Sequence, residues 1–257
     1  MKSVLLTGIR TGIGRNLLER FMADHWHVTG VIRRESQRRA FADFPQDRLK
    51  LFVADLSRED ETFRLIEGIR ALAFNVIVLN AGMTYSGHFL KLPREHIDEI
   101  IRTNLLANMH IVHGLIGRAV ENNAKIVFIS SLAARLPAFN SGVYAASKAG
   151  LSHFYTSLSY EYPALPMLCV EIGLVNTPFF EKSGAPAGPR NSFFKSPALI
   201  GGRLYREIQT KRGMTSLCAD WTMMRKAFMI FEALTVWIIS KLRSAYYSRQ
   251  KILTKVL

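Results

Sequence analysis

Tyr144 and Lys148 stand four positions apart in a segment rich in small residues, which favours a helix. At this spacing two side chains project from one helical face, so the phenol and the ammonium can act on the same small molecule. In a site that excludes water, a nearby ammonium favours the phenolate and lowers the pKa of the tyrosine. Tyr144 is therefore a candidate general acid. Taken alone, such a short pattern more often marks a half-buried aromatic and a solvated lysine, so the interpretation depends on partners elsewhere.

A glycine-rich segment near the start of the chain is the first such partner. It follows an apolar run over residues 4–6, and apolar residues recur after it at helical spacing. The segment is Thr7-Gly8-Ile9-Arg10-Thr11-Gly12-Ile13-Gly14. A strand, a glycine turn and a helix in this order let backbone N–H groups approach a pyrophosphate at the helix N-terminus. We expect a dinucleotide site here, with a plain turn between strand and helix as the alternative.

Basic residues indicate which dinucleotide the site prefers. The predicted strand over residues 27–32 ends in Arg33 and Arg34, where a fold that recognises a free ribose 2′-OH has an acidic residue. Arginine suits a 2′-phosphate instead, and Arg10 adds a cation within the glycine turn. The residues favour NADP(H) over NAD(H), although arginines at a strand end are often only solvated.

Two further strands are followed by residues suited to a cofactor. Asp55 and Leu56 come after the strand predicted over 49–54, where the carboxylate can hold the adenine or cap the helix that follows. The small residues Asn80, Ala81 and Gly82 follow an apolar strand over 75–79. Residues this small let a cofactor lie against the backbone.

The remaining pattern gives the fold. A long helix containing Asn104 is predicted over residues 93–113, and a strand over 125–129 ends in Ser130 and Ser131. Helices and strands alternate through the first two-thirds of the chain. We therefore predict an α/β fold with a doubly wound parallel sheet, a Rossmann fold, that binds its ligand at the carboxyl ends of the strands.

These segments together resemble the short-chain dehydrogenase/reductase family in its single-domain form, over residues 4 to about 180. Besides the glycine turn, the resemblance rests on Asp55, the tripeptide 80–82 and the set Asn104, Ser131, Tyr144 and Lys148. The intervals of 13 residues from Ser131 to Tyr144 and 27 from Asn104 to Ser131 are similar to those of the family.

The resemblance implies a role for each member of that set. Ser131 would hold the substrate oxygen beside the Tyr144 hydroxyl, and Tyr144 would protonate it as hydride leaves the nicotinamide. Lys148 would bind the nicotinamide ribose and keep the phenol acidic. Asn104 would anchor a water that relays protons from Lys148, although an asparagine there can also satisfy a helix kink.

The segment after the sixth predicted strand, 167–171, resembles the part of the family that flanks the nicotinamide. Gly173, Val175 and Thr177 are the residues expected at the cofactor, with Thr177 on the carboxamide. Ile172 stands where the family usually has proline, which leaves the turn less constrained.

Three segments follow this one. Residues 183–197 are rich in Gly, Pro, Ser and Ala and contain Phe193 and Phe194, which favours a lid over an apolar substrate, with a plain connector as the alternative. Ser196 and Pro197 predict the start of a helix to about residue 212. Residues 214–219 are a weak candidate for a last strand.

The tail combines basic and apolar residues. Residues 203–257 contain eleven Lys or Arg and three Asp or Glu, so they supply +8 of the net charge of +14. The apolar stretch 227–239 is too short for a bilayer span and contains Glu232. Three alternatives stay open: peripheral contact with an anionic membrane through residues 225–257, a subunit interface, or a wall of the substrate pocket.

Composition is consistent with one globular enzyme. The chain has 257 residues, 49% of them hydrophobic and 21% charged, and only two cysteines, Cys169 and Cys218, which suggests a reducing compartment. No spacing of metal ligands and no nucleic-acid motif accompanies the charge, so we expect neither a metal nor nucleic acid. The apolar run near the start of the chain is too short for a signal sequence, which predicts a cytoplasmic protein.

These observations predict a catalytic domain over residues 1–219 and a helical extension over 220–257. The predicted function is NADP(H)-dependent interconversion of a ketone and a secondary alcohol on an apolar, lipid-like substrate, by a homo-oligomer at the inner face of a membrane. The alternative is a dinucleotide-binding sensor or scaffold that uses the tail to bind a partner or membrane.

Overall fold

The computed structural model describes residues 1–177 and 195–217. Residues 1–217 form one compact unit around a seven-stranded sheet of order β3-β2-β1-β4-β5-β6-β7. The strands are β1 (Ser3–Thr7), β2 (His27–Ile32), β3 (Leu49–Val53), β4 (Val76–Leu79), β5 (Lys125–Ser131), β6 (Met167–Ile172) and β7 (Gly213–Leu217). Every neighbouring pair is parallel, so the predicted doubly wound parallel sheet is confirmed.

Strand order brings the predicted site residues together at the carboxyl ends of the central strands. The order reverses between β1 and β4, because the chain winds outward first through β2 and β3 and then through β5, β6 and β7. Ligands of open parallel sheets bind at the carboxyl ends of the strands beside such a reversal. The glycine turn follows β1 and residues 80–82 follow β4, so both lie at this point.

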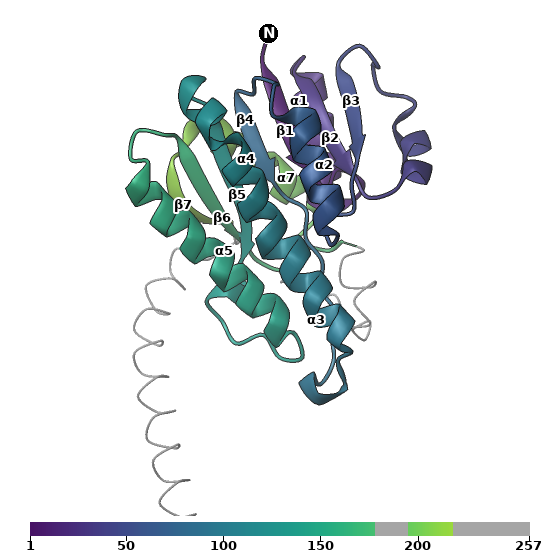
Figure 1. Cartoon of the computed structure of the whole chain (residues 1–257), viewed down its shortest axis with the longest axis vertical. Coiled ribbons are helices and arrows are strands. Elements are labelled where there is room, and N and C mark those ends of the chain that lie inside the picture. The colour runs from purple at the N-terminus through teal and green to yellow at the C-terminus, as the bar shows by residue number, and fades with distance from the viewer. Residues whose placement is uncertain (178–194, 218–257) are drawn as a thin grey trace, which may run out of the picture. The chain divides into compact units, whose positions relative to one another are not determined.

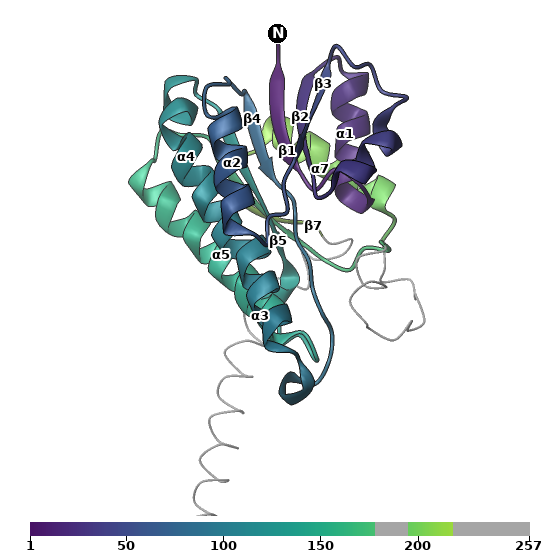
Figure 2. The same cartoon turned by 45° about the vertical axis from the view of Figure 1, so that its right-hand side comes forward.

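Helices cover both faces of the sheet (Figure 1). The helices α1 (Gly12–Ala23) and α7 (Pro197–Thr210) lie on one face. The other face is covered by α2 (Glu59–Ile69), α4 (Ala107–Glu121) and α5 (Gly142–Glu161), and Figure 2 shows the sheet between the two groups. Both sides of the central strands are therefore buried, which explains their continuous apolar runs.

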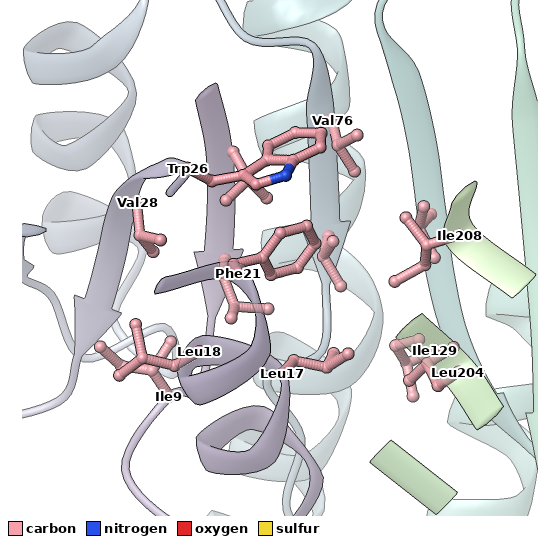
Figure 3. Close-up of a cluster of buried hydrophobic side chains, with 14 of the residues drawn as sticks. Ile9, Leu17, Leu18, Phe21, Trp26, Val28, Val76, Ile129, Leu204 and Ile208 are labelled. Carbon is pink, nitrogen blue, oxygen red and sulfur yellow. The ribbon is translucent and has the colours of Figure 1, made fainter. Parts of the chain in front are cut away.

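A cluster of buried hydrophobic side chains around Phe21 joins α1 to α7 and to the sheet (Figure 3). The ring of Phe21 is fully buried and meets Trp26 and Tyr205 edge-on, with centroids 5.1 and 5.0 Å apart. Leu17 and Leu204 bury their side chains in the same cluster. This packing holds α1 against the sheet, so its N-terminus stays directed at the glycine turn.

One predicted helix is wrong in detail. The segment 93–113 is not one regular helix, because α3 (Arg94–Ile101) and α4 are joined by a π-helical turn over Arg102–Leu106 that contains Asn104. A π-turn shifts the hydrogen-bond register without changing the apolar period, so the sequence pattern does not reveal it.

The last predicted strand forms despite its weak pattern, since β7 pairs along β6 from Gly213 to Leu217. The predicted lid, 183–197, and the tail beyond 217 lie largely or wholly outside the described residues. Within residues 1–177 and 195–217, no helix combines the length and the apolarity needed to cross a bilayer.

Candidate active site

The glycine turn is fixed by hydrogen bonds to the loop after β4. Thr7 is fully buried, and its Oγ1 accepts from the backbone N–H groups of Asn80 and Ala81 at 3.0 and 2.9 Å. In return, Asn80 Nδ2 donates to the carbonyls of Thr7 and Gly8 at 2.9 and 3.1 Å. Thr7 and the Asn80 amide therefore position the turn, whereas both were expected at the cofactor itself.

The three glycine positions of the turn leave no room for a side chain. Gly8 and Gly12 have φ of +72° and +60°, which favours glycine. A Cβ on Gly14 would lie 2.1 Å from the Gly8 carbonyl oxygen, and one on Gly12 would lie 2.9 Å from Thr177 Cγ2. The backbone N–H groups that start α1 thus lie in a narrow cradle between the turn and the segment after β6. This arrangement fits a pyrophosphate.

The other residues expected at the cofactor are either buried in the core or exposed near the proposed site. Leu56 and Val175 are buried in the two apolar clusters, and Ile13 packs against one of them, so their side chains serve the core. Arg10 and Thr11 are exposed at the turn. Gly173 lies just beyond β6, where its partly buried backbone is open to a close approach.

At the end of β2, Arg33 is bonded to a carboxylate. Its Nε donates to Asp55 Oδ2 at 2.7 Å, while Asp55 Oδ1 accepts from the backbone and hydroxyl of Ser57 at 3.1 and 2.7 Å. Burial alone would raise the pKa of Asp55, but the hydrogen bonds from Ser57 and Arg33 outweigh it and lower that pKa. Asp55 therefore both organises the turn before α2 and neutralises Arg33, and Arg34 is exposed beside it.

Asn104 joins the loop after β4 to the catalytic helix. Its fully buried side chain accepts from Met83 N–H at 2.8 Å and donates to the Met83 carbonyl at 2.9 Å and to Ser147 Oγ at 3.0 Å. Its own carbonyl, in the π-turn, accepts from Asn108 Nδ2 at 2.7 Å. In this structure Asn104 has a positioning role. The π-turn that contains it agrees with the helix irregularity raised from the sequence, whereas the proton relay stays a prediction.

Lys148 is buried in the middle of α5. Its side chain has 4% of its surface exposed, and Nζ donates to the Ile129 carbonyl at 2.8 Å. Burial lowers the pKa of Lys148 from 10.5 to about 8. A Cβ on Gly82 would lie 3.4 Å from both Lys148 Nζ and Asn104 Oδ1, so the small residue after β4 makes space for both polar groups.

Ser131 and Tyr144 meet across the site. Ser131 ends β5, and its Oγ accepts from the Ala133 backbone at 3.2 Å. Burial raises the pKa of Tyr144, and a side-chain hydrogen bond with Ser131 lowers it in part. The Lys148 ammonium lies 5.9 Å from the centroid of the Tyr144 ring.

One expectation about this pair is wrong for the protein alone. Lys148 was expected to lower the pKa of Tyr144, whereas the net shift is upward because removal of the phenol from water dominates. The phenol therefore stays protonated at neutral pH. That is the state a general acid needs before it donates.

The structure brings together Asn104, Ser131, Tyr144, Lys148 and Gly82 at one end of the sheet. The basic residues at the end of β2 do not join them, since Arg33 is instead bonded to Asp55, after β3. Within the described part of the chain, no group of three His, Cys, Asp or Glu side chains is placed to hold a metal ion.

Sequence reasoning missed several residues of this region. Ser147 links Asn104 to the carbonyl of Tyr144, to which its Oγ donates at 2.7 Å. Thr84 Oγ1 is buried without a hydrogen-bond partner among the described residues, which leaves a polar atom available near the loop after β4. The only sign of these residues in the sequence is that they are small and polar within mostly apolar segments.

An apolar rim was also missed. Phe89, Leu90 and Phe139 are 69%, 86% and 94% exposed on the loops that follow β4 and β5. The two loops are tied by a hydrogen bond from Gly87 N–H to the Asn140 carbonyl at 2.9 Å. We call these three residues the apolar rim.

Comparison with known proteins agrees with this fold. A family model described as short chain dehydrogenase matches residues 2–187. Serine 3-dehydrogenase of Rhizobium radiobacter is 24% identical over 182 residues, 69% of this chain and 73% of that protein. Inactive hydroxysteroid dehydrogenase-like protein 1 of Mus musculus is 27% identical over 203 residues, 76% of this chain and 60% of that protein.

A solved structure matches most of the chain. A short-chain dehydrogenase from Sphingobium yanoikuyae in complex with NADPH superposes with a TM-score of 0.77 at 22% identity. The match covers 91% of this chain and 95% of that chain.

Proposed function

Because the chain belongs to the short-chain dehydrogenase/reductase family, oxidoreductases that act on CH–OH groups with NAD(P), we propose that it interconverts a ketone and a secondary alcohol with Tyr144 as general acid and base. The cofactor supplies or accepts the hydride when it is bound. Asn104, Ser131, Tyr144 and Lys148 are the residues proposed to do the rest.

The roles proposed for Ser131, Tyr144 and Asn104 rest on contacts described above, and the role proposed for Lys148 rests on its burial near the Tyr144 ring and on the family resemblance. Ser131 donates a hydrogen bond to the substrate oxygen and holds it beside the Tyr144 hydroxyl, which gives that oxygen its proton. The Lys148 ammonium binds the nicotinamide ribose and stabilises the phenolate left on Tyr144. Asn104 keeps Gly82 and α5 at the spacing this requires, through its bonds to Met83 and Ser147.

The observation that supports this proposal most is the Ser131–Tyr144 hydrogen bond above a buried Lys148. Replacement of Tyr144 by Phe removes only the hydroxyl. We expect turnover with NADPH to fall by about 10³-fold, the range typical of a lost general acid, with cofactor affinity nearly unchanged. Full turnover by Tyr144→Phe on the true substrate would refute the mechanism.

The cofactor proposed is NADP(H). Arg33, Arg34 and Arg10 supply three cations at the adenosine end, and the NADPH complex of the Sphingobium structure is consistent with this choice. Asp55 reduces the charge available at Arg33, which is why NAD(H) stays the alternative. Dissociation constants for NADPH and NADH distinguish the two.

The proposed substrate is apolar and lipid-like. The apolar rim lies on the loops that lead to Ser131 and Tyr144, so a large apolar molecule entering there would cover side chains now in water. A panel of long-chain and cyclic ketones, compared with short polar ones, tests this by kcat/KM. Equal values across the panel would contradict it.

The tail is proposed to act at a membrane. Residues 220–257 form the proposed extension to a catalytic domain of 1–219, and the basic and apolar residues of 225–257 favour peripheral binding at the inner, cytoplasmic face. Flotation with anionic vesicles at low and physiological salt measures it. Protein that stays unbound at both salts would favour a subunit contact in a homo-oligomer instead.

A second candidate function is a dinucleotide-binding sensor or scaffold. The mouse relative whose name marks it as inactive is the observation that favours it. This function would be preferred if NADPH bound tightly and no carbonyl compound was reduced in a broad metabolite screen.

A further inference from the structure

A buried carboxylate lies beneath the catalytic helix and has no part in the proposed reaction. Glu171 on β6 is 4% exposed. Its side chain points to the face of the sheet covered by α5, because Met167 and Cys169, four and two positions before it, pack in that cluster. A buried carboxylate is strongly destabilising unless it is paired, so its partners indicate what it is for.

The main partner is Arg135, on the turn that begins at Ser131. Arg135 Nε donates to Glu171 Oε1 at 2.9 Å. Ser131 caps the start of the 3₁₀ turn over Leu132–Ala134, and the Arg135 backbone N–H closes it by donating to the Leu132 carbonyl at 2.9 Å. The ion pair therefore fixes the far end of the short turn whose first residue holds the substrate oxygen.

A second connection runs from Glu171 to the catalytic helix through two buried serines. Ser152 Oγ lies 3.5 Å from Glu171 Oε1 and 2.7 Å from Ser130 Oγ, and Ser130 Oγ donates to the Lys148 carbonyl at 3.1 Å. Ser130 pairs with Glu171 across β5 and β6, and Ser152 lies one helical turn after Lys148. One carboxylate is thus connected to both sides of the site.

The charge on Glu171 also affects the direction of these hydrogen bonds. Two hydroxyl groups have two protons, but three contacts are present: Glu171 with Ser152, Ser152 with Ser130, and Ser130 with Lys148. A charged carboxylate attracts the Ser152 proton, and a neutral amide in its place attracts it less. Loss of the charge would therefore rearrange the bonds that reach the backbone at Lys148.

We propose that Glu171, with Arg135, is a positioning residue that fixes Ser131 and Lys148 relative to the Tyr144 hydroxyl. The inference rests on the proposed function, because Ser131 and Lys148 matter only if they act on a substrate. Glu171 touches neither substrate nor cofactor in this account, and it acts through the turn 131–135 and the serine pair.

The experiment compares three variants of the full-length protein. Glu171→Gln removes the charge with little change in shape, and the double variant Arg135→Met with Glu171→Leu replaces the pair by apolar side chains. The control is Glu207→Gln, which breaks the Glu207–Lys211 ion pair of 2.9 Å on α7, away from the site. For each we measure kcat and KM for a ketone, the NADPH dissociation constant, and the melting temperature.

We expect Glu171→Gln to lower kcat about tenfold, because small displacements of positioned groups slow a reaction strongly, with NADPH affinity within about twofold of wild type. The double variant should regain the melting temperature, since an apolar side chain at position 171 leaves no unpaired charge in the interior, but it should not regain kcat. The control should keep kcat. Recovery of kcat together with melting temperature would mean that the pair only stabilises the fold, and would overturn the inference.

A separate measurement distinguishes this failure from failure of the proposed function. If wild type reduces no ketone, the proposed function fails. Amide hydrogen exchange then tests, without any activity, whether Glu171 orders the turn 131–135 and the helix α5. Faster exchange over residues 130–136 and 144–152 in Glu171→Gln, but not in Glu207→Gln, would support it. Unchanged exchange in both segments would overturn it.

Discussion

At the adenosine end of the proposed cofactor site, the cation Arg33 has 41% of its side chain exposed and is bonded to a carboxylate, Asp55. At the catalytic end, Lys148 is 4% exposed and bonded to a carbonyl, that of Ile129. Among the described residues, no carboxylate forms an ion pair with Lys148. The two ends present positive charge to the same proposed ligand in opposite environments.

The different environments of Arg33 and Lys148 show where a positive charge lowers the stability of the fold and where it does not. Arg33 gains a partner and stays solvated, so the pair contributes little and is weakened by salt. Lys148 loses water without gaining a negative partner, and its pKa falls to about 8. We infer that the catalytic end sacrifices stability for function, whereas the adenosine end does not.

Among the changes that test this contrast between the two ends, Lys148→Met should have the largest effect. Removal of the ammonium should lower kcat by about 10²-fold or more, because the phenolate on Tyr144 loses its stabilising charge. The same variant should be more stable at pH 7 by about 1 to 3 kcal/mol. A lysine whose pKa falls from 10.5 to about 8 opposes folding by about 3 kcal/mol, and loss of the hydrogen bond to the Ile129 carbonyl offsets part of that gain. Urea unfolding measures this, and a less stable variant would contradict the comparison.

The sign of the pH effect on stability follows from the same shift. Between about pH 8 and 10.5 the unfolded chain holds a proton on Lys148 that the folded protein has lost. Stability from this group therefore rises with pH across that window. The stability advantage of Lys148→Met over wild type should shrink over the same window.

The second prediction concerns activity and pH. In the reductive direction, kcat/KM for NADPH should fall about tenfold per pH unit above pH 8, as the free enzyme loses the Lys148 ammonium. Tyr144 does not account for this decline, because burial raises its pKa from the ordinary value of a tyrosine. Lys148→Arg keeps its charge, so its decline should move to higher pH. If the decline in kcat/KM still began at pH 8 in that variant, the decline would have to come from another titrating group.

Much of this arrangement could be predicted from the sequence. The strand 27–32 agrees with β2 residue for residue, and the others agree within two residues, because apolar runs end at small or polar residues. The proximity of Ser131 to Tyr144 followed from the family resemblance. These features depend on local pattern, which a single sequence contains.

Other features depend on contacts that pattern does not encode. The upward shift in the pKa of Tyr144 depends on burial by several elements, and the π-turn at Asn104 depends on hydrogen-bond register. Glu171 could be predicted as part of a strand, but its partner Arg135 lies 36 residues earlier. The apolar rim was missed because single exposed aromatics have no distinguishing spacing.

The third prediction tests the exposed end of the site. Arg33→Ala should weaken NADPH binding about tenfold, the loss typical of one charge-assisted hydrogen bond, and should leave NADH binding within about twofold. The variant also leaves Asp55 without its partner, so the carboxylate would repel a 2′-phosphate. Equal weakening of both cofactors would mean that Arg33 serves only the turn around Asp55.

The smallest effect is expected at Arg34, which is exposed and begins the 3₁₀ helix over Glu35–Phe41. A solvated arginine that is free to move gains less from a phosphate than one held in place, so Arg34→Ala should weaken NADPH binding only about threefold. Raising the salt from 50 to 500 mM should remove most of that difference, but not the effect of Lys148→Met on kcat, because screening acts on exposed charges and not on buried ones. If the two arginines had equal effects at both salts, the ion pair with Asp55 would give Arg33 no advantage over a solvated arginine in holding a phosphate, and the larger effect expected of Arg33 would be contradicted.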